Sequence, residues 1–365
     1  MGLQCGIIGI TNIGKTTIFN CISDNKVETS SFAFSTNKSN LGQIKVPDER
    51  LHKIDSFINS VKIVPTSMEI IDIPGLAKGS SHGEGVGNSF LADIRNCDAL
   101  IHVVRCFDDE NLVHIDVSID PVRDKEIIDF ELQITDLESI DKRIQKWEKS
   151  AKTGDKQAKI ALEVLAKCKS HLEELNNLRT LDLKPEDFQF INELSLLTIK
   201  PVLFVCNVDD ASAVKGNEYV DHFKASLADS KEDILLIAGK IESEITELED
   251  EEDRQSFLAD LGLEEPGVNK LIRSAYSMLN LQTFFTAGPK EIKAWTIRKG
   301  MTAPEAAGVI HSDLQRGFIR AEVMKYHDFI ELGSESACRD AGKLYIEGKK
   351  YIVTDGDILH IRFNV

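Results

Sequence analysis

An eight-residue run from Gly9 to Thr16, Gly-Ile-Thr-Asn-Ile-Gly-Lys-Thr, constrains the fold of this chain more than any other feature. It matches the P-loop pattern GxxxxGK[ST]. Residues 3–8 before it are short and apolar, as in a buried parallel strand, and residues 16–21 are typical of a helix start. A strand, a glycine-bounded loop and a helix N-terminus form a cradle whose backbone amides bind phosphate. The run therefore predicts a site for a nucleoside triphosphate.

Each position of this loop has an expected role. Gly9 and Gly14 allow backbone conformations that a side chain would forbid. Lys15 reaches the β- and γ-phosphates and takes part in catalysis, and the hydroxyl of Thr16 holds Mg²⁺. Asn12 is a candidate for holding K⁺ beside the phosphates. The residues expected to bind nucleotide here are Thr11, Asn12, Ile13, Gly14, Lys15, Thr16 and Thr17.

The sequence Asp-Ile-Pro-Gly at residues 72–75 follows a strand-like run and matches the DxxG element of nucleotide switches. Asp72 is predicted on the Mg²⁺ side of the site. The amide of Gly75 is expected to meet the γ-phosphate, which would tie the following loop to the state of the nucleotide. A further metal contact should come from the loop before this strand, where Thr36 is the candidate. The predicted metal ligands are Thr16, Thr36 and Asp72.

The base-reading loop is expected after the strand-like run at residues 202–206. The next four residues, Asn-Val-Asp-Asp, stand where guanine readers have NKxD. Asp210 keeps the carboxylate that accepts hydrogen bonds from guanine, but Val208 replaces the Lys. Asn207 could instead pair with adenine by donating to N7 and accepting from the exocyclic amine. The residues therefore leave ATP and GTP open, with base-side candidates Asn207, Val208, Asp210, Ala238 and Gly239.

Hydrolysis is expected to be slow. Small GTPases orient the attacking water with a Gln directly after DxxG, and this chain has Leu76 at that position. An aliphatic side chain cannot orient water. His114 is the candidate for this task, because an imidazole can orient or deprotonate water near neutral pH. The predicted catalytic residues are Lys15, Gly75 and His114.

Charge and composition narrow the class of protein. The formal net charge is −17, which argues against a generic nucleic-acid coat, although residues 142–169 are rich in Lys. We see no signal-peptide pattern and no apolar run long enough for a bilayer. The 7 Cys include no CxxC pair and are typical of free thiols in a reducing compartment. A cytoplasmic protein without a membrane partner or DNA sequence specificity is expected.

The pattern of apolar residues predicts three segments. Residues 1–280 alternate strand and helix signals, which favours an α/β domain with a parallel-rich sheet. Within it, apolar residues of segment 125–200 recur at helical spacing on either side of a turn, which predicts an inserted antiparallel helical hairpin. Residues 281–365 combine short strands with a helix near 302–311, as in a small α+β module.

These motifs together resemble the YchF family of Obg-like ATPases. Besides the P-loop and the Asp72 element, the resemblance lies in four runs, GEGVGN at 83–88, RCF at 105–107, TFFTAG at 283–288 and DGDILHIRFNV at 355–365. It covers essentially the whole chain. It implies a P-loop G domain with a helical hairpin, followed by a TGS domain with a ubiquitin-like β-grasp fold. It also implies ATP preference, slow hydrolysis and association with the ribosome.

The resemblance also suggests partners and leaves alternatives. The large ribosomal subunit and ribosomal RNA are the expected partners, reached through the hairpin and the TGS module. Residues 31–37 depart from the family's mobile-loop motif, and Asp210 stands where the family often has Glu. A GTPase acting in translation and a nucleotide-gated scaffold with negligible turnover are the alternative functions.

Overall fold

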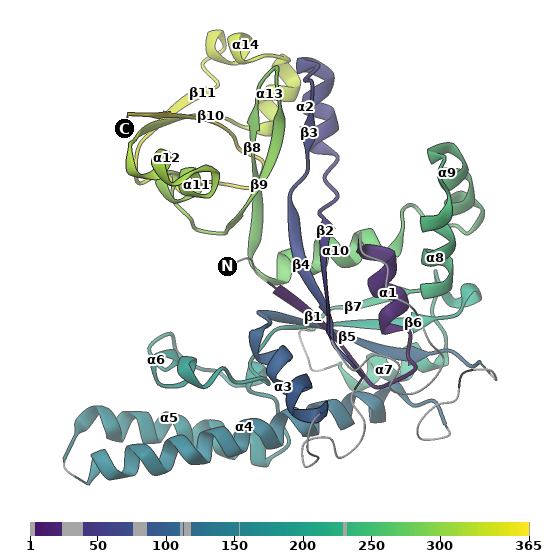
Figure 1. The fold of residues 1–365 in the computed structure, drawn as a ribbon, viewed down its shortest axis with the longest axis vertical. Coiled ribbons are helices and arrows are strands. Elements are labelled where there is room, and N and C mark those ends of the chain that lie inside the picture. Colours follow the sequence, from purple (N-terminus) through teal and green to yellow (C-terminus); the bar gives the residue numbers. More distant parts are fainter. Residues whose placement is uncertain are drawn as a thin grey trace. The chain divides into compact units, whose positions relative to one another are not determined.

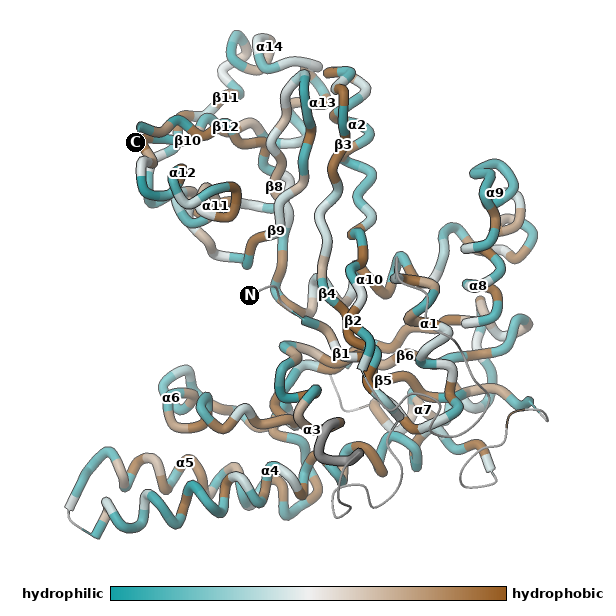
Figure 2. The backbone as a smooth tube through the Cα atoms, viewed as in Figure 1, coloured by the Kyte–Doolittle hydropathy of each residue, from teal (hydrophilic) through white to brown (hydrophobic). Residues whose placement is uncertain are grey.

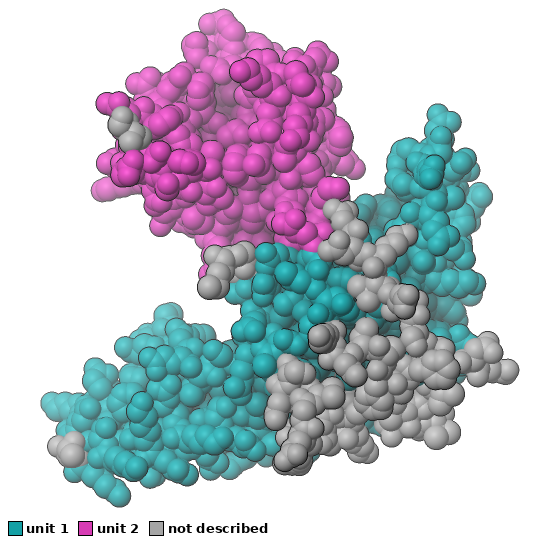
Figure 3. All heavy atoms as spheres, in the orientation of Figure 1, with its two compact units in different colours: residues 1–42, 69–271 teal, residues 43–68, 272–365 magenta. Residues whose placement is uncertain are grey.

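The computed structural model describes residues 4–23, 39–75, 86–109, 112, 118–152, 154–228 and 232–364. The chain forms two compact units (Figure 3). Unit 1 contains residues 1–42 and 69–271, and unit 2 contains residues 43–68 and 272–365. Thus the second unit interrupts the first in sequence, and the polypeptide passes between them more than once.

Unit 1 is built on a six-stranded sheet with the order β2-β4-β1-β5-β6-β7 (Figure 1). Its four pairings from β4 through β1, β5 and β6 to β7 are parallel. This confirms the predicted α/β class with a parallel-rich sheet. The strands are β1 (Gln4–Ile8), β2 (Asn40–Lys45), β4 (Ser67–Asp72), β5 (Ala99–Cys106), β6 (Val202–Val208) and β7 (Ile234–Ile237).

Helices cover both faces of this sheet, which explains why its central strands lack alternation. Every residue of β5 and β6 is buried, and Figure 2 shows their apolar residues within the sheet. Outside the segment between β5 and β6, the α-helices of unit 1 are α1 (Lys15–Ile22), α3 (Val86–Asn96), α7 (Glu218–Ser226), α8 (Gly239–Glu247) and α9 (Glu251–Asp260), and α10 (Gly267–Met278) begins in unit 1 and ends in unit 2. No helix in the described parts of the chain has the length and apolar character needed to cross a bilayer.

A long helical hairpin is inserted between β5 and β6, as predicted. It consists of α4 (Pro121–Ala151) and α5 (Lys156–Glu173), which begin at the N-cap residues Asp120 and Asp155. Each cap carboxylate accepts hydrogen bonds from the first backbone amides of its helix, which fixes where the helix starts. Apolar residues of the two helices, among them Ile140, Leu165 and Cys168, form the hairpin's own core.

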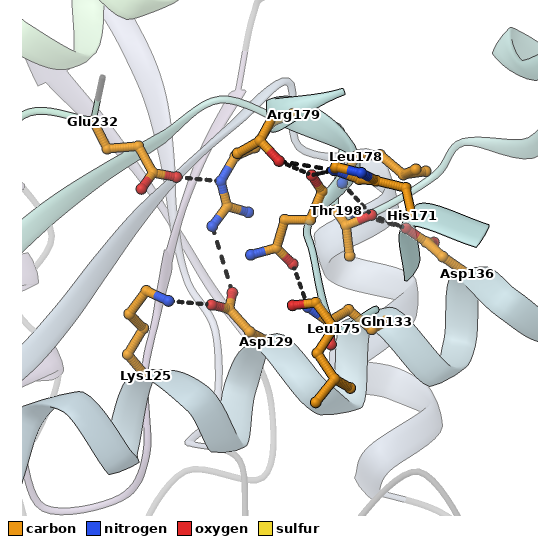
Figure 4. Close-up of polar contacts among 12 residues, drawn as sticks. Lys125, Asp129, Gln133, Asp136, His171, Leu175, Leu178, Arg179, Thr198 and Glu232 are labelled. Carbon is orange, nitrogen blue, oxygen red and sulfur yellow. Dashed lines mark hydrogen bonds and ion pairs between the residues drawn. The ribbon is translucent and has the colours of Figure 1, made fainter. Parts of the chain in front are cut away.

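The chain returns to β6 through short helical segments, η2 (Leu178–Thr180), α6 (Phe188–Ile191) and η3 (Asn192–Leu194). Figure 4 shows the polar network that fixes this return against α4. Arg179 forms ion pairs with Asp129 of α4 and with Glu232, just before β7. The carboxylate of Asp136 accepts hydrogen bonds from the amides of Leu197 and Thr198. Buried carboxylates therefore join the hairpin to the sheet.

Unit 2 has a mixed six-stranded sheet with the order β11-β10-β12-β8-β9-β3. Its strands are β3 (Ile63–Val64), β8 (Leu281–Ala287), β9 (Ile292–Arg298), β10 (Phe318–Met324), β11 (Leu344–Glu347) and β12 (Ile358–Phe363). β12 pairs with β8 in parallel, whereas β10 pairs with β11 and β12, and β8 with β9, in antiparallel fashion. The helices of this unit are α2 (Arg50–Ile58), α11 (Ala303–Ile310), α12 (Ser312–Arg316), α13 (Tyr326–Leu332) and α14 (Glu335–Asp340).

The extent of unit 2 differs from the sequence-based division at residue 280. Residues 43–68, which we placed in the first domain, contribute β3 and α2 to unit 2. β3 pairs with β9, and Leu51 and Ile54 of α2 lie in one core cluster with Phe285 and Phe329. These contacts join segments more than two hundred residues apart in the sequence. Local patterns carry no signal for such pairing.

Candidate nucleotide and magnesium site

The glycine-bounded loop connects β1 to α1 and depends on backbone conformations that favour glycine. Gly9 and Gly14 have φ values of 148° and 89°, and Asn12 has a φ of 62°. A Cβ on Gly14 would lie 2.2 Å from Asn207 Nδ2, and one on Gly9 would lie 2.6 Å from the carbonyl oxygen of Val103. The close approach of other segments therefore adds a second reason for these glycines.

Lys15 is folded back onto the loop. Its side chain is 7% exposed, and Nζ donates a hydrogen bond of 2.6 Å to the carbonyl oxygen of Ile10. Burial lowers the pKa of Lys15 to about 8, and the negative charge of Asp72 opposes this shift. An ammonium held this way is poorly solvated, so anionic phosphate oxygens would be strong partners for it.

Asp72 lies beside the loop because β1 and β4 are parallel neighbours, with Ile7 opposite Asp72. Thr16 Oγ1 donates a 2.9 Å hydrogen bond to Asp72 Oδ2. The carboxyl group is 2% exposed, and burial raises its pKa, although Lys15 and Thr16 act in the opposite direction. The structure thus brings the predicted ligands Thr16 and Asp72 together.

Gly75 completes this part of the site. A Cβ on Gly75 would lie 2.8 Å from Thr11 Cγ2 and 3.0 Å from Lys15 Nζ. The backbone after Asp72 therefore runs directly over the phosphate loop, and a side chain at this position would fill the space next to the lysine. This is the placement expected for an amide that meets a terminal phosphate.

The donor set suits Mg²⁺. Four buried side-chain polar atoms of the described residues lack a hydrogen-bond partner, and three of them, Thr11 Oγ1, Asn40 Nδ2 and Asp72 Oδ1, belong to residues at or beside this site. A carboxylate oxygen with no partner and a neighbouring hydroxyl are ligands that a hard cation prefers. Thr16 and Asp72 would hold the ion directly or through its water shell.

The side chain of Asn207 joins two segments of the site. Its Nδ2 donates to the carbonyl oxygen of Ile13 at 2.8 Å, and its Oδ1 accepts from the amide of Gly239 at 3.0 Å. The side chain is 4% exposed. Asn207 therefore joins the phosphate loop to the start of α8. An amide nitrogen carries two hydrogens and an amide oxygen two lone pairs, so the contact of Asn207 with the base stays a prediction.

The other base-side candidates lie at the carboxyl ends of β6 and β7. Val208 and Ala238 are buried, and Thr17 Cγ2 would be 3.7 Å from a Cβ on Gly239. Asp210 is partly exposed and pairs with Lys240, with Nζ 3.3 Å from Oδ2. This ion pair is an accessible polar feature of the predicted base side.

Arg105 is a residue that the sequence analysis did not assign. It is 1% exposed at the end of β5, and its guanidinium donates to the carbonyl oxygens of Phe107, Asp109 and Leu112. It thereby fixes the segment that follows β5. An Arg in a mostly apolar strand is the sequence signal for such a role. Thr36, Leu76 and His114 lie outside the described residues.

Comparisons with known proteins agree with this geometry. A family model described as "50S ribosome-binding GTPase" matches residues 4–167, and a model for the C-terminal part of YchF GTPases, described as a protein of unknown function, matches residues 281–364. The chain is 46% identical over 365 residues to the ribosome-binding ATPase YchF of Haemophilus influenzae, covering 100% of both chains. It is 45% identical over 367 residues to the Bacillus subtilis protein of the same name, again covering 100% of both.

The solved structure of the Schizosaccharomyces pombe YchF GTPase has the same fold. It superimposes with a TM-score of 0.87 at 33% identity, over 99% of this chain and 98% of that one. Full-length identity of this level, together with a P-loop, an Asp72 element and a hairpin in their expected places, leads to one conclusion: the chain belongs to the YchF family.

Proposed function

We propose that this protein is a Mg²⁺-dependent ATPase that binds the ribosome and switches with its nucleotide state. The observation that carries the proposal is the convergence of the Gly9–Thr16 loop, Asp72 and Gly75 around a buried lysine. The relatives from Haemophilus influenzae and Bacillus subtilis are named ribosome-binding ATPases, which supports the same reading.

Different residues of the site bind different parts of the triphosphate and its metal ion. The loop amides and Lys15 bind the β- and γ-phosphates, and Thr16 and Asp72 hold the metal side. Bound Mg²⁺ would neutralise charge on the phosphates. The amide of Gly75 meets the terminal phosphate, so the segment after it responds to the loss of that group. Thr36 is proposed as a further metal ligand, and His114 as the group that orients water.

A lysine variant tests this proposal directly. Lys15→Ala should lower ATP affinity about tenfold to a hundredfold, because charge-assisted hydrogen bonds to phosphate are lost. Removing a buried ammonium should leave the melting temperature of the free protein unchanged or raised. The measurement is titration with a fluorescent ATP analogue, with exposed Lys290→Ala as the control. Unchanged affinity in Lys15→Ala would contradict the proposal.

The rate of ATP hydrolysis distinguishes a nucleotide-dependent switch from a scaffold with negligible turnover. Leu76 in place of Gln predicts slow phosphate release by the free protein. We infer that ribosomes accelerate this release. Phosphate release measured with and without ribosomal particles distinguishes the switch from the scaffold. Release that stays at the blank rate in both cases would favour a nucleotide-gated scaffold.

Exchanging K⁺ for Na⁺ in the same assay tests the proposed monovalent ion beside Asn12.

The base preference rests on Val208, Asp210 and Lys240. Val208 cannot cover a guanine ring as a Lys stem does, which favours ATP, and Lys240 occupies one oxygen of the Asp210 carboxylate. Asp210 itself favours the GTPase alternative, because a free carboxylate would accept hydrogen bonds from guanine. Lys240→Met should therefore raise GTP affinity by about threefold to fivefold, consistent with an exposed ion pair, while Asp210→Ala should lower GTP affinity only. Competition between ATP and GTP measures both, and equal changes for the two nucleotides would exclude this assignment.

We further propose the large ribosomal subunit and its RNA as the docking partner, in the cytoplasm. The end of the hairpin supports this, because exposed lysines contact phosphate groups readily. Basic residues outnumber acidic ones there; the basic residues are Lys142, Arg143, Lys146, Lys149, Lys152, Lys156 and Lys159, and the acids are Glu148 and Asp155. The family model's description names the 50S particle.

A further inference from the structure

Asn40 places an unused hydrogen-bond donor beside the magnesium side of the site. It is the first residue of β2, which neighbours β4 in the sheet, and Asp72 is the last residue of β4. The Nδ2 atom of Asn40 is buried without a hydrogen-bond partner, and so is Asp72 Oδ1. Two such atoms on neighbouring strands, one a donor and one an acceptor, lie next to the same predicted metal site.

The position of Asn40 is fixed from several sides. The hydroxyl of Ser39 donates to Asp93 of α3. A Cβ on Gly42 would lie 2.9 Å from the ring of Phe19, so β2 is packed tightly against the P-loop helix α1. Asn40 is therefore held by packing that its own side chain does not supply. A buried donor that the fold positions and does not satisfy is costly, which argues for a ligand as its partner.

The chemistry of the surroundings indicates what that partner is. The amide of Asn40 lies near enough to the Asp72 carboxylate to favour its charged form, yet no hydrogen bond of normal geometry reaches Nδ2. An NH₂ group cannot bind a metal ion, but it donates to oxygen. The oxygens gathered at such a site are those of carboxylate, phosphate and the water ligands of Mg²⁺, which usually keeps several waters.

We propose that Asn40 is a positioning residue of the magnesium site, whose side-chain amide donates a hydrogen bond to the oxygen shell of bound Mg²⁺ next to Asp72. This inference rests on the proposed function, because it assumes that a magnesium–nucleotide complex binds here. The role resembles that of the outer partners which orient the ligands of other metal sites, where removal of one partner typically weakens metal binding tenfold to a hundredfold.

A pair of amide variants tests the assignment. Asn40→Leu removes the unsatisfied donor, so the ligand-free protein should keep or gain stability, whereas the Mg²⁺ concentration needed for half-maximal ATP binding should rise about tenfold. ATP affinity in the presence of EDTA should not change. Asn40→Ser, which restores a small donor, should recover part of the Mg²⁺ dependence and guards against a packing defect of the leucine.

Gln4→Leu is the matched control. Gln4 is also an amide in this sheet, but its Nε2 donates to Glu69 Oε2 at 2.6 Å. This variant should lose stability and keep the normal Mg²⁺ dependence. An unchanged Mg²⁺ dependence in Asn40→Leu, or a loss of stability that lowers ATP affinity equally with and without Mg²⁺, would overturn the role of Asn40. Failure of the unmodified chain to bind ATP at all would instead overturn the proposed function, and this inference with it.

Discussion

His102 is a titratable residue in the middle of the central strand β5. The side chain is 2% exposed, and its ring centroid lies 5.3 Å from that of Phe204 on the neighbouring strand β6. Burial lowers the pKa of His102 to about 3, and the charge of Asp129 only partly opposes this shift. The folded protein therefore keeps a neutral imidazole at pH values where the unfolded chain binds a proton.

This linkage predicts an acid-sensitive stability. Below the ordinary histidine pKa of about 6.5 and down to about 3, the unfolded state gains one proton that the folded state does not, so the free energy of unfolding should fall by about 1.4 kcal/mol per pH unit from this group. His102→Leu should remove that contribution. Urea unfolding between pH 7 and pH 4 gives the free energy of unfolding of each protein. The value for the unmodified chain minus that for His102→Leu should fall as the pH falls.

The exposed His222→Leu serves as the control and should keep the pH slope of the unmodified chain. A difference between His102→Leu and the unmodified chain that stays constant over this pH range would show that the two states bind the same number of protons at this residue. The loss of ring packing against Phe204 alone would produce such a constant difference, because packing does not depend on pH.

Residues within local patterns were predictable, and those defined by distant contacts were not. Lys15, Thr16 and Asp72 follow strand-like runs, and the parallel sheet then brings their ends together. Asn207 also follows a strand, but its partners Ile13 and Gly239 lie 194 and 32 residues away in the sequence. Nothing near Asn207 in the sequence indicates these two contacts, so the sequence predicts only its contact with the base.

At the scale of secondary-structure elements, the root of the hairpin depends on a cluster of buried charges (Figure 4). Arg179 lies between Asp129 and Glu232, with its side chain 9% exposed, and Lys125 Nζ lies 2.7 Å from Asp129 Oδ2. Burial alone would raise the pKa of Asp129, but Arg179 and Lys125 outweigh it and hold the pKa below its usual range. The cluster is balanced only while every member is present.

Removal of the central cation should therefore be costly. Arg179→Met removes two ion pairs at once and leaves Lys125 as the remaining cationic partner of the buried Asp129, so it should reduce the free energy of unfolding by about 3 kcal/mol. Arg143→Met is the control, because Arg143 pairs with Glu193, whose side chain is 78% exposed, and its loss should cost less than about 1 kcal/mol. Chemical denaturation gives both values. Similar losses in the two variants would mean that the buried cluster contributes no more than a surface pair.

Among the secondary-structure elements, the hairpin helices could be predicted from the sequence, and the pairing of β3 with β9 could not. The helices of the hairpin were expected because their apolar residues recur at helical spacing, and the hairpin's core consists of such residues. The short pairing of β3 with β9 was not expected, because a two-residue strand carries no periodicity of its own. Its partner β9 lies in the segment 281–365, which the sequence predicts to be a separate module.

For the molecule as a whole, charge is the property that relates the chain to its proposed partner. The formal net charge of −17 would repel RNA, so binding should depend on the basic end of the hairpin. Replacing the exposed Lys146, Lys149 and Lys156 by Glu should weaken binding to ribosomal particles at least tenfold and reduce the slope of log affinity against log salt by about 2. ATP affinity should not change. Filter binding over a salt series measures the slope.

The control carries the same change in charge at exposed lysines of other elements, Lys215, Lys224 and Lys270. This triple Glu variant should keep most of the affinity for ribosomal particles and nearly the full salt slope. An equal loss in both triple variants would show that total charge, and not the end of the hairpin, governs the association.

The way in which residues 43–68 are built into unit 2 limits how the protein can be dissected. Cutting the chain before β8 would remove Phe285 and Phe329 but retain α2, whose Leu51 and Ile54 pack against them. In the shortened polypeptide, the apolar face of α2 would be exposed to solvent, and the fragment would tend to aggregate. An isolated nucleotide-binding fragment suited to biophysical work would instead need a short linker in place of residues 46–66, joining the end of β2 to the start of β4.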